Sequence, residues 1–423
     1  MLPPMTESAP SAPVFDPRAV IEGRTPGRTS VVLIAGIVIA TACGIAALSI
    51  DAGESFATGR GVVPFIVALP LALLPVPLLV ALVLWVDRLE PEPRGALMFA
   101  FAWGAGIAAL FALIINTAGL EYVTQPALGA STGEYVSATF GAPVVEETLK
   151  GLVLVILLRL RRTEFDGPTD GVIYAAMVGL GFAMVENVGY YINALVTPQQ
   201  GGIALLGYTF VLRGLLSPLL HPIFTSMTGL GVAYAASRRS GGTWAIVVGW
   251  LAAMMLHGIW NGLSLFGTAG VLTGYAIMSC VLAGIIAVLV ADRHRVVGLI
   301  RHYLPGYTAT GLVTSDDIAM LSSLRARRQA RNWARTRGGL PAAAAMGDYQ
   351  LAATELALLH NKAAEGVIDR STFTTRQHDL LALMHIARRS FSRRSYGNHR
   401  AEPPHAPWAP PGASAFAPGR HVS

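Results

Sequence analysis

The chain has 423 residues, of which 53% are hydrophobic and only 13% are charged, and its mean hydropathy is +0.53. A soluble domain carries about 25% charged residues, so this composition excludes an ordinary soluble domain and indicates a polytopic membrane protein. The formal net charge is +6, but the arginines follow apolar runs or lie in the C-terminal region, and we therefore expect no nucleic-acid partner.

The elements follow in chain order. Residues 1–29 are rich in Pro, Ser, Thr and Gly and predict a disordered arm. Eight apolar runs then predict an all-α bundle of about eight transmembrane helices, because each is long enough to cross the hydrocarbon core. The predicted spans cover residues 31–50, 62–86, 96–120, 136–158, 171–196, 205–236, 244–266 and 271–291.

The arginines predict the orientation of these spans. They follow the second, fourth, sixth and eighth spans, whereas the loops between the others hold Arg60 alone. Cytoplasmic loops carry the excess of Lys and Arg, so we expect a multi-pass protein of the cytoplasmic membrane with both termini in the cytoplasm. The bilayer is thus one partner of the chain, and its oligomeric state stays open.

The region after the last span predicts a small helical cytoplasmic tail. We expect a helix at 314–335, because Thr314 can act as its N-cap. We expect two more helices at 342–364 and 371–389, because apolar residues recur there at helical spacing. The Pro- and Ala-rich residues 395–423 predict disorder. The predicted organisation is therefore an arm (1–29), a transmembrane domain (30–291), a helical region (292–394) and a disordered tail (395–423).

Polar side chains that are costly in a bilayer lie in four consecutive spans. Such residues are rare in membranes and usually functional. They are Glu146, Glu147 and Lys150 in the fourth span, Glu186 and Asn187 in the fifth, Arg213 and His221 in the sixth, and His257 and Asn261 in the seventh. Helical spacing places Glu146 and Lys150 on one face, and His257 and Asn261 on another. We therefore predict one shared site, with Arg213 interpreted as structural or as a residue that reaches toward the membrane surface.

These groups suit peptide-bond hydrolysis in a cavity that excludes water. A buried glutamate can accept a proton from water, and we predict Glu146 as this base with Glu147 as its rival. His257 and Asn261 can donate hydrogen bonds to the developing oxyanion. Alternatively, the histidines and a glutamate supply three ligands to zinc and leave one position for water. Lys150 is the expected counter-charge.

The same residues form an ordered set of motifs. They are Glu146-Glu147-x-x-Lys150, Phe182-x-x-x-Glu186-Asn187, His221-x-x-x-Thr225 and His257-x-x-Trp260-Asn261, preceded by an acidic, Pro-containing loop at residues 87–93. Over residues 62–291 this set resembles the PrsW family of bacterial intramembrane proteases and, more distantly, the CAAX prenyl proteases.

The resemblance implies an endopeptidase that cuts membrane-associated proteins, in some members an anti-sigma factor of a signalling cascade. It implies that Glu146 and Glu147 carry the base and that His221 and His257 bind a metal or polarise the carbonyl. The predicted zinc ligands are His221, His257 and Glu186, with Lys150 and Asn187 in support. For the distantly similar prenyl proteases a metal-free glutamate mechanism is argued, and they carry a histidine where this chain has Glu186. The metal-dependent and the metal-free mechanism therefore both stay open for this chain.

Two other classes of function remain as alternatives. Ionisable residues in spans also mark the ion pathways of transporters and channels, although no inverted repeat is visible in this sequence. A non-catalytic membrane scaffold that binds a partner through its helical tail is the third class.

Overall fold

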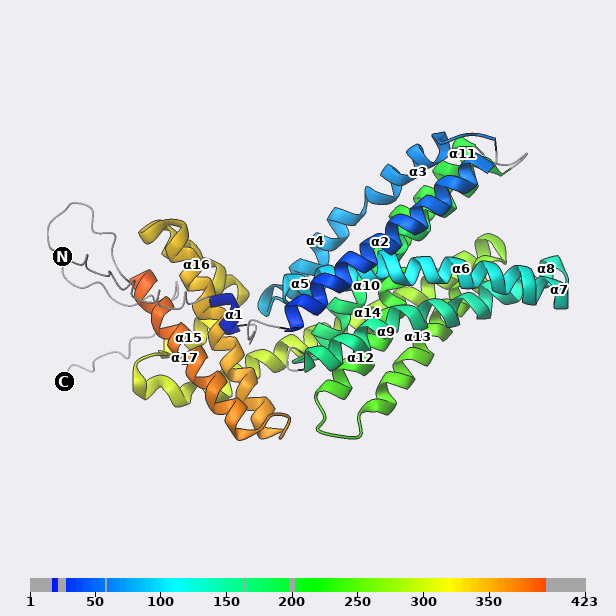
Figure 1. Ribbon diagram of the computed structural model, residues 1–423. Coiled ribbons are helices and arrows are strands. Elements are labelled where there is room, and N and C mark those ends of the chain that lie inside the picture. The colour runs from blue at the N-terminus through cyan, green and yellow to red at the C-terminus, as the bar shows by residue number, and fades with distance from the viewer. Residues whose placement is uncertain (1–16, 22–27, 58, 163–164, 198–201, 393–423) are drawn as a thin grey trace, which may run out of the picture. The chain divides into compact units, whose positions relative to one another are not determined.

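A computed structural model gives the architecture of the chain (Figure 1). It describes residues 17–21, 28–57, 59–162, 165–197 and 202–392. The predicted tail at 395–423 and most of the predicted arm at 1–29 lie outside these residues, so both remain predictions. Within the described residues, all regular structure is helical and no strand occurs, which confirms the predicted all-α fold.

The chain divides into two compact units, which we describe separately. The first, here called the transmembrane unit, comprises residues 26–296 with 364–367. The second, here called the terminal unit, comprises residues 1–25, 297–363 and 368–423.

Seven helical stretches among the described residues are long and apolar enough to cross a membrane. They are Val31–Ala57, Val63–Leu89, Arg94–Leu128, Pro168–Val196, Ile203–Ala236, Thr243–Ser264 and Gly267–Thr310. These stretches correspond to seven of the eight predicted spans. The remaining predicted span, at 136–158, corresponds to helix α9 (Ala142–Leu160), whose glutamates, lysine and arginine lower its apolar content.

The stretches are built from α-helices joined by short π-helical or 3-10 turns. The α-helices of the transmembrane unit are α2 (Arg28–Ala57), α3 (Val63–Leu73), α4 (Val76–Val86), α5 (Arg94–Trp103), α6 (Ala109–Gly119), α7 (Gln125–Leu128), α8 (Ala130–Val136), α9, α10 (Pro168–Val196), α11 (Ile203–Thr209), α12 (Leu220–Ala236), α13 (Thr243–Ser264) and α14 (Gly267–Tyr303). The π-helical turns are η2 (Gly104–Ala108), η3 (Leu120–Thr124), η4 (Ser137–Gly141) and η6 (Phe210–Leu216).

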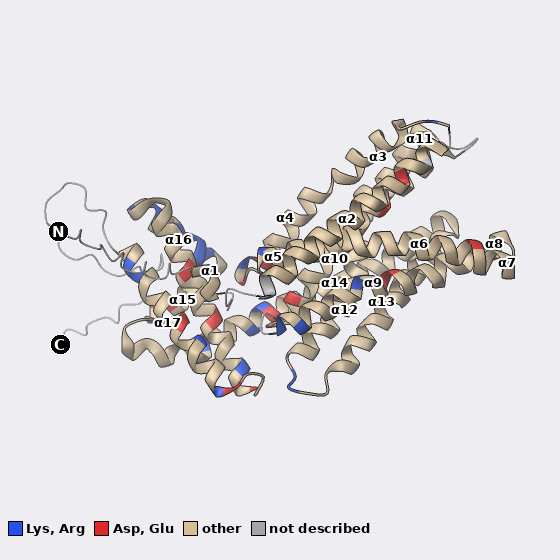
Figure 2. Ribbon diagram, in the orientation of Figure 1, with Lys and Arg blue, Asp and Glu red and all other residues tan. Residues whose placement is uncertain are grey.

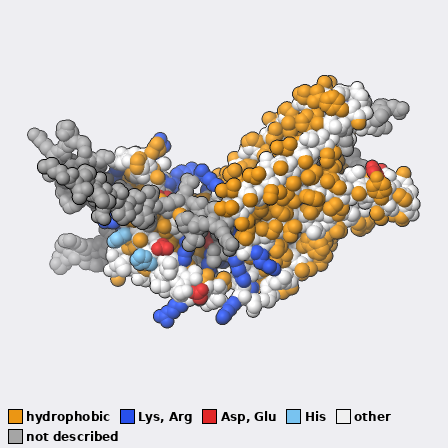
Figure 3. Space-filling model, in the orientation of Figure 1, with side chains coloured by type: hydrophobic (Ala, Val, Ile, Leu, Met, Phe, Trp, Pro, Cys, Tyr) orange, Lys and Arg blue, Asp and Glu red, His pale blue; other side chains and the backbone are white. Residues whose placement is uncertain are grey.

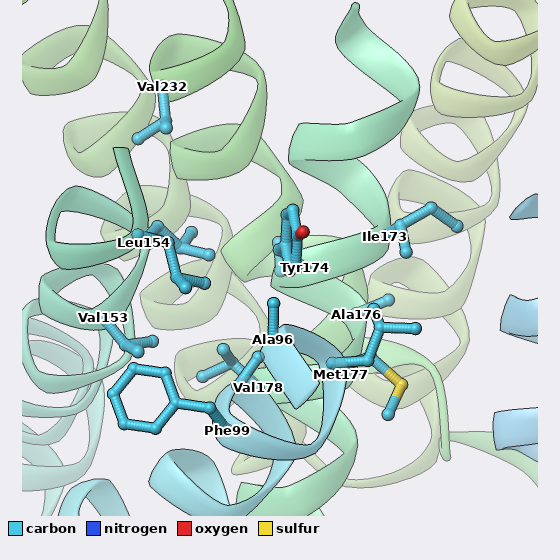
Figure 4. Packing of buried hydrophobic residues seen from close by; sticks show 14 of the residues in the cluster. Ala96, Phe99, Val153, Leu154, Ile173, Tyr174, Ala176, Met177, Val178 and Val232 are labelled. Carbon is cyan, nitrogen blue, oxygen red and sulfur yellow. The ribbon is translucent and has the colours of Figure 1, made fainter. Parts of the chain in front are cut away.

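Helix α10 forms the centre of the transmembrane unit. In the most apolar 18-residue segment of α10, 89% of the residues are buried, whereas the corresponding share in the other six stretches is 17–39%. Figure 4 shows the core on one side of α10, where Tyr174 and Val178 lie near Phe99 of α5, Leu154 of α9 and Val232 of α12. The outward surface is covered with hydrophobic side chains (Figure 3), as expected for helices that face lipid.

Paired glycines allow α10 and α12 to cross closely. A Cβ atom at Gly171 of α10 would overlap the carbonyl group of Gly229 on α12, and a Cβ at Gly229 would overlap that of Gly171. Small residues at such crossings are how membrane helices gain packing contacts. The crossing fixes α12, and with it the polar residues of that helix, against the central helix.

We expect Gly229→Val to destabilise the protein, because either backbone must move to accept the side chain. The expected loss is about 1–3 kcal/mol, the usual range for overpacking. Thermal unfolding in detergent micelles measures it. Gly284→Val is the matched control, since no atom lies within 4 Å of a Cβ at Gly284 of α14. Equal midpoints for the two variants would contradict the proposed role of the crossing.

The terminal unit is a small helical module made of α1 (Pro17–Ile21), the 3-10 turn η7 (Leu304–Thr310), α15 (Ser315–Leu321), α16 (Leu324–Ala364) and α17 (Arg370–Ser392). The predicted N-cap is confirmed, because Thr314 accepts a hydrogen bond from the Asp317 backbone N–H in a capping box. The predicted single helix at 314–335 is wrong: α15 ends at Leu321, and α16 continues beyond 335. Non-helical dihedral angles at Gly338 and Gly339 kink α16.

The N-terminal helix α1 belongs to the same unit as the C-terminal helices. The Arg376 guanidinium on α17 donates hydrogen bonds to the carbonyl oxygens of Val20, at 2.6 Å, and Ile21, at 3.1 Å. These contacts hold the two ends of the described chain on one module.

Candidate active site

Four helices of the transmembrane unit bring the predicted polar residues together: α9, α10, α12 and α13. The π-helical turn η4 runs directly into α9. Pro143 lies in the first turn of α9, where its missing N–H group is tolerated because first-turn N–H groups have no partner within their own helix. One turn later, Glu146 and Glu147 face the interior and are buried.

Lys150 is the centre of the cluster and is fully buried. Its Nζ donates to Glu146 Oε2 at 3.2 Å and to Glu147 Oε1 at 3.0 Å. It also lies 3.0 Å from His221 Nδ1 and over the Phe182 ring. An ammonium group only donates, so Nδ1 of His221 is the acceptor in this contact. The predicted role of Lys150 as counter-charge therefore extends to a histidine on another helix.

The tautomer of His221 follows from this contact. Because Nδ1 accepts, the ring proton resides on Nε2, which lies 2.8 Å from Glu186 Oε2 and donates to it. Glu186 also forms an ion pair with Arg213, and Arg213 Nε donates to Asn187 Oδ1 at 2.8 Å. The Arg213 guanidinium lies over the Tyr190 ring. Arg213 is thus held by protein groups at the partly exposed edge of the cluster.

Glu147 holds His257. Its Oε1 accepts a hydrogen bond from His257 Nδ1 at 3.0 Å, and its Oε2 accepts one from Thr225 Oγ1 at 2.9 Å. All of the carboxylate's contacts are therefore to protein groups, and Glu147 is fully buried. The Nδ1–H donation leaves the lone pair of His257 on Nε2, which lies 3.9 Å from Glu146 Oε2. A carboxylate that orients an imidazole in this way is typical behind metal-binding or catalytic histidines.

Asn116 of α6 is a site residue that the sequence analysis missed. Its Nδ2 donates to Glu146 Oε1 at 3.2 Å. Its buried Oδ1 has no hydrogen-bond partner among the described residues. A single Asn within the apolar residues 109–119 was the available signal, since a polar group in a span needs a partner.

Asn261 is hydrogen-bonded to the backbone, and no hydrogen bond joins it to a carboxylate among the described residues. Its Nδ2 donates to the carbonyl oxygen of Ala138 in η4, at 2.9 Å. The amide thus fastens α13 to the turn that leads into α9. The predicted oxyanion contact of Asn261 remains a prediction.

Three residues of the cluster could hold a zinc ion once the Lys150 ammonium leaves His221 Nδ1, because Glu186 already holds the other ring nitrogen. Glu146, His221 and His257 each offer one donor atom, and these three atoms all lie within 4.8 Å of one another. Two imidazole nitrogens and a carboxylate oxygen form a ligand set typical of catalytic zinc. Glu186, the predicted third ligand, instead contacts His221 and Arg213 in this structure.

The charges of the cluster also favour a cation. Three carboxylates, those of Glu146, Glu147 and Glu186, are paired with the fixed cations of Lys150 and Arg213. With neutral histidines, this leaves a net negative charge in a buried place, which a bound cation would offset.

The fold and the site together define a class, namely polytopic membrane hydrolases whose glutamates and histidines are buried between helices. Residues 92–290, which include all four helices of the cluster, match the family described as PrsW family intramembrane metalloprotease. Over these residues the transmembrane unit is therefore similar to the intramembrane metalloproteases of the PrsW family.

Curated relatives agree with this assignment. Protease PrsW of Geobacillus kaustophilus (strain HTA426) is 29% identical over 182 residues, which are 42% of this chain and 71% of that protein. Protease PrsW of Bacillus subtilis (strain 168) is 25% identical over 177 residues, 41% of this chain and 72% of that protein. Protease PrsW of Clostridioides difficile (strain 630) is 33% identical over 118 residues, 27% of this chain and 47% of that protein. No solved structure matches the chain.

Proposed function

We propose that this intramembrane protease hydrolyses peptide bonds with Glu146 at the reacting atoms and Glu147 as the residue that positions His257. The observation that carries the proposal is the pair of contacts on His257. Nδ1 is held by Glu147, so Nε2 is presented to Glu146, and His221 lies within the same buried group. Sequence spacing alone left the two glutamates as rivals, and their different partners support this division of roles.

In the metal-free form of the proposal, Glu146 is the general base. Its Oε2 accepts a proton from the attacking water, whose oxygen bonds to the substrate carbonyl carbon, and the proton then passes to the leaving amine nitrogen. His257 Nε2 accepts a hydrogen bond from the same water, and Lys150 stabilises the negative charge of the carboxylates. Asn116 holds the other oxygen of Glu146, and Asn261 fixes the entry to α9.

In the metal-dependent form, Glu146, His221 and His257 would hold zinc. The ion would supply Lewis-acid activation of water and polarisation of the carbonyl. Glu147 and Glu186 then orient the two imidazoles through hydrogen bonds to their ring nitrogens. Glu146 is essential in both forms, and the metal content of the protein separates them.

The hydrolytic function is tested by comparing membranes that contain either the native chain or His257→Ala. Mass spectrometry of new protein termini should find cleavage products of membrane proteins only with the native chain. His294→Ala is the matched control, because His294 of α14 is exposed and outside the cluster. The same set of termini in all three membranes would contradict the proposal.

The metal is tested by elemental analysis of the purified protein. We expect about one zinc per chain, and loss of that zinc in His221→Ala and His257→Ala but not in His294→Ala. Native protein that contains no zinc and cleaves fully in a chelator would instead support the metal-free form.

The proposed substrate is a membrane-anchored protein, and an anti-sigma factor is the class that the family resemblance suggests. A fusion of a membrane-anchored anti-sigma factor to a reporter, co-reconstituted with this protein, tests that class. Cleavage of unrelated membrane proteins at the same rate would contradict it.

We further propose that both termini lie in the cytoplasm of a cell-membrane protein. The packing of α1 on α17 in one unit supports this, because two ends on one module lie on the same side of the membrane. An even number of crossings is then required, and the seven apolar stretches together with α9 supply eight. Reporter fusions at the two ends should both give a cytoplasmic signal. Signals from opposite sides of the membrane would contradict the proposal and would mean that α9 does not cross the membrane.

A further inference from the structure

A stripe of arginines runs along the first half of α16. Arg325, Arg328, Arg331 and Arg335 are all exposed, and α16 shows blue segments in Figure 2. At about 100° per residue these four positions fall within an arc of about 120°. The opposite face carries Ala330 and Ala334, which are fully buried. The helix is therefore amphipathic, with one face packed in the terminal unit and one outer face whose charged residues are all basic. We call this face the arginine stripe.

The arginine stripe lacks neutralising carboxylates. No Asp or Glu occurs between Asp317 and Asp348 in the sequence. Among the described residues, no ion pair joins the four arginines to a carboxylate. Arg331 donates instead to the neutral Gln350, at 2.8 Å. The nearby carboxylates of Asp317 and Glu355 are paired with other arginines, on α17.

The positive charges also act on one another. Partial burial and the neighbouring Arg328 charge lower the pKa of the Arg331 guanidinium. Like charges that are held close on a folded helix are stabilised by an anionic partner with several charges, since each new contact relieves repulsion.

We propose that the arginine stripe binds the anionic headgroups of membrane lipids. The apolar stretch Gly267–Thr310 leads directly into the terminal unit, and α16 begins at Leu324. The chain thus tethers the terminal unit to the membrane, so the lipid surface is an anionic partner that is always available to this helix.

The experiment uses the full chain in lipid nanodiscs. A spin label is placed at Asn332→Cys, within the arginine stripe, after Cys43→Ala and Cys280→Ala. In nanodiscs rich in phosphatidylglycerol, we expect the label to be less accessible to a water-soluble relaxation agent than in phosphatidylcholine alone. About 1 M salt should reverse the difference, because it screens exposed charges. A label at His378→Cys, whose side chain is 84% exposed on α17, should not change.

Charge variants make the test specific. Arg328→Gln with Arg335→Gln should weaken the partition of α16 to the anionic surface by about 30-fold. The matched control removes two exposed arginines of α17, with Arg370→Gln and Arg389→Gln, and should leave the lipid effect intact. Equal accessibility in both lipids, or an equal loss in the control, would overturn the proposal. If the label becomes less accessible only when RNA is added, and not with anionic lipid, the proposal is overturned and the arginine stripe binds nucleic acid instead.

Discussion

Glu146→Gln is expected to reduce cleavage of a membrane substrate by about 100- to 10,000-fold, the contribution of a positioned general base. Glutamine keeps the shape of the side chain. Its amide can still accept a hydrogen bond from Lys150 and form a hydrogen bond with the side-chain amide of Asn116. It cannot take a proton from water, and it is a poor metal ligand. The measurement is the single-turnover cleavage rate in proteoliposomes at equal protein content.

The neighbouring glutamate provides the decisive comparison. Glu147→Gln should cost only about 10- to 100-fold, because Glu147 acts by orienting His257 and glutamine still accepts one hydrogen bond. Glu121→Gln, at an exposed position in η3, should have no effect and controls for the change in charge. A larger loss for Glu147→Gln than for Glu146→Gln would reverse the proposed roles and make Glu147 the base.

The sequence predicted which residues form this cluster better than it predicted which of them contact one another. Apolar runs interrupted by Glu, Lys and His predicted which helices hold polar groups, because such groups are costly in lipid and must face the interior. The spacing also predicted the contacts within one helix, such as that of Lys150 with Glu146. Contacts between helices depend on the rotation of each helix about its axis, which periodicity does not specify.

Irregular turns explain the largest differences. In an unbroken helix over the predicted span at 205–236, His221 would lie about 24 Å from the start of the span, at 1.5 Å per residue. In the structure this span is broken: α11 ends at Thr209, the π-helical turn η6 follows, and α12 begins only at Leu220. A π-helical turn changes the register of all later side chains, and Pro218 and Pro222 remove backbone donors near the break. His221 therefore lies at the start of a helix and reaches Lys150.

Asn116 and Asn261 illustrate the same limit for amides. Asn261 has the spacing of a site residue relative to His257, yet its amide binds the backbone of η4. Asn116 has no motif around it, yet it binds Glu146. Neutral amides find partners on other helices or on backbone carbonyls, so their roles follow from the packing and not from their own segment.

Lys150→Met is expected to destabilise the protein by about 3–5 kcal/mol, the usual cost of removing one partner from a buried ion pair. Lys150 is fully buried and contacts both Glu146 and Glu147, so methionine leaves two carboxylates without their shared donor. The measurement is thermal or denaturant unfolding in micelles. Lys362→Met in α16 is the matched control, and it should change the stability by less than about 1 kcal/mol because this lysine is only half-buried.

A compensated variant separates loss of charge balance from loss of packing. Lys150→Met combined with Glu147→Gln removes one cation and one carboxylate together, so it should recover part of the stability that Lys150→Met loses. If Lys150 acts chiefly by filling space over the Phe182 ring, the single and double variants should be equally unstable.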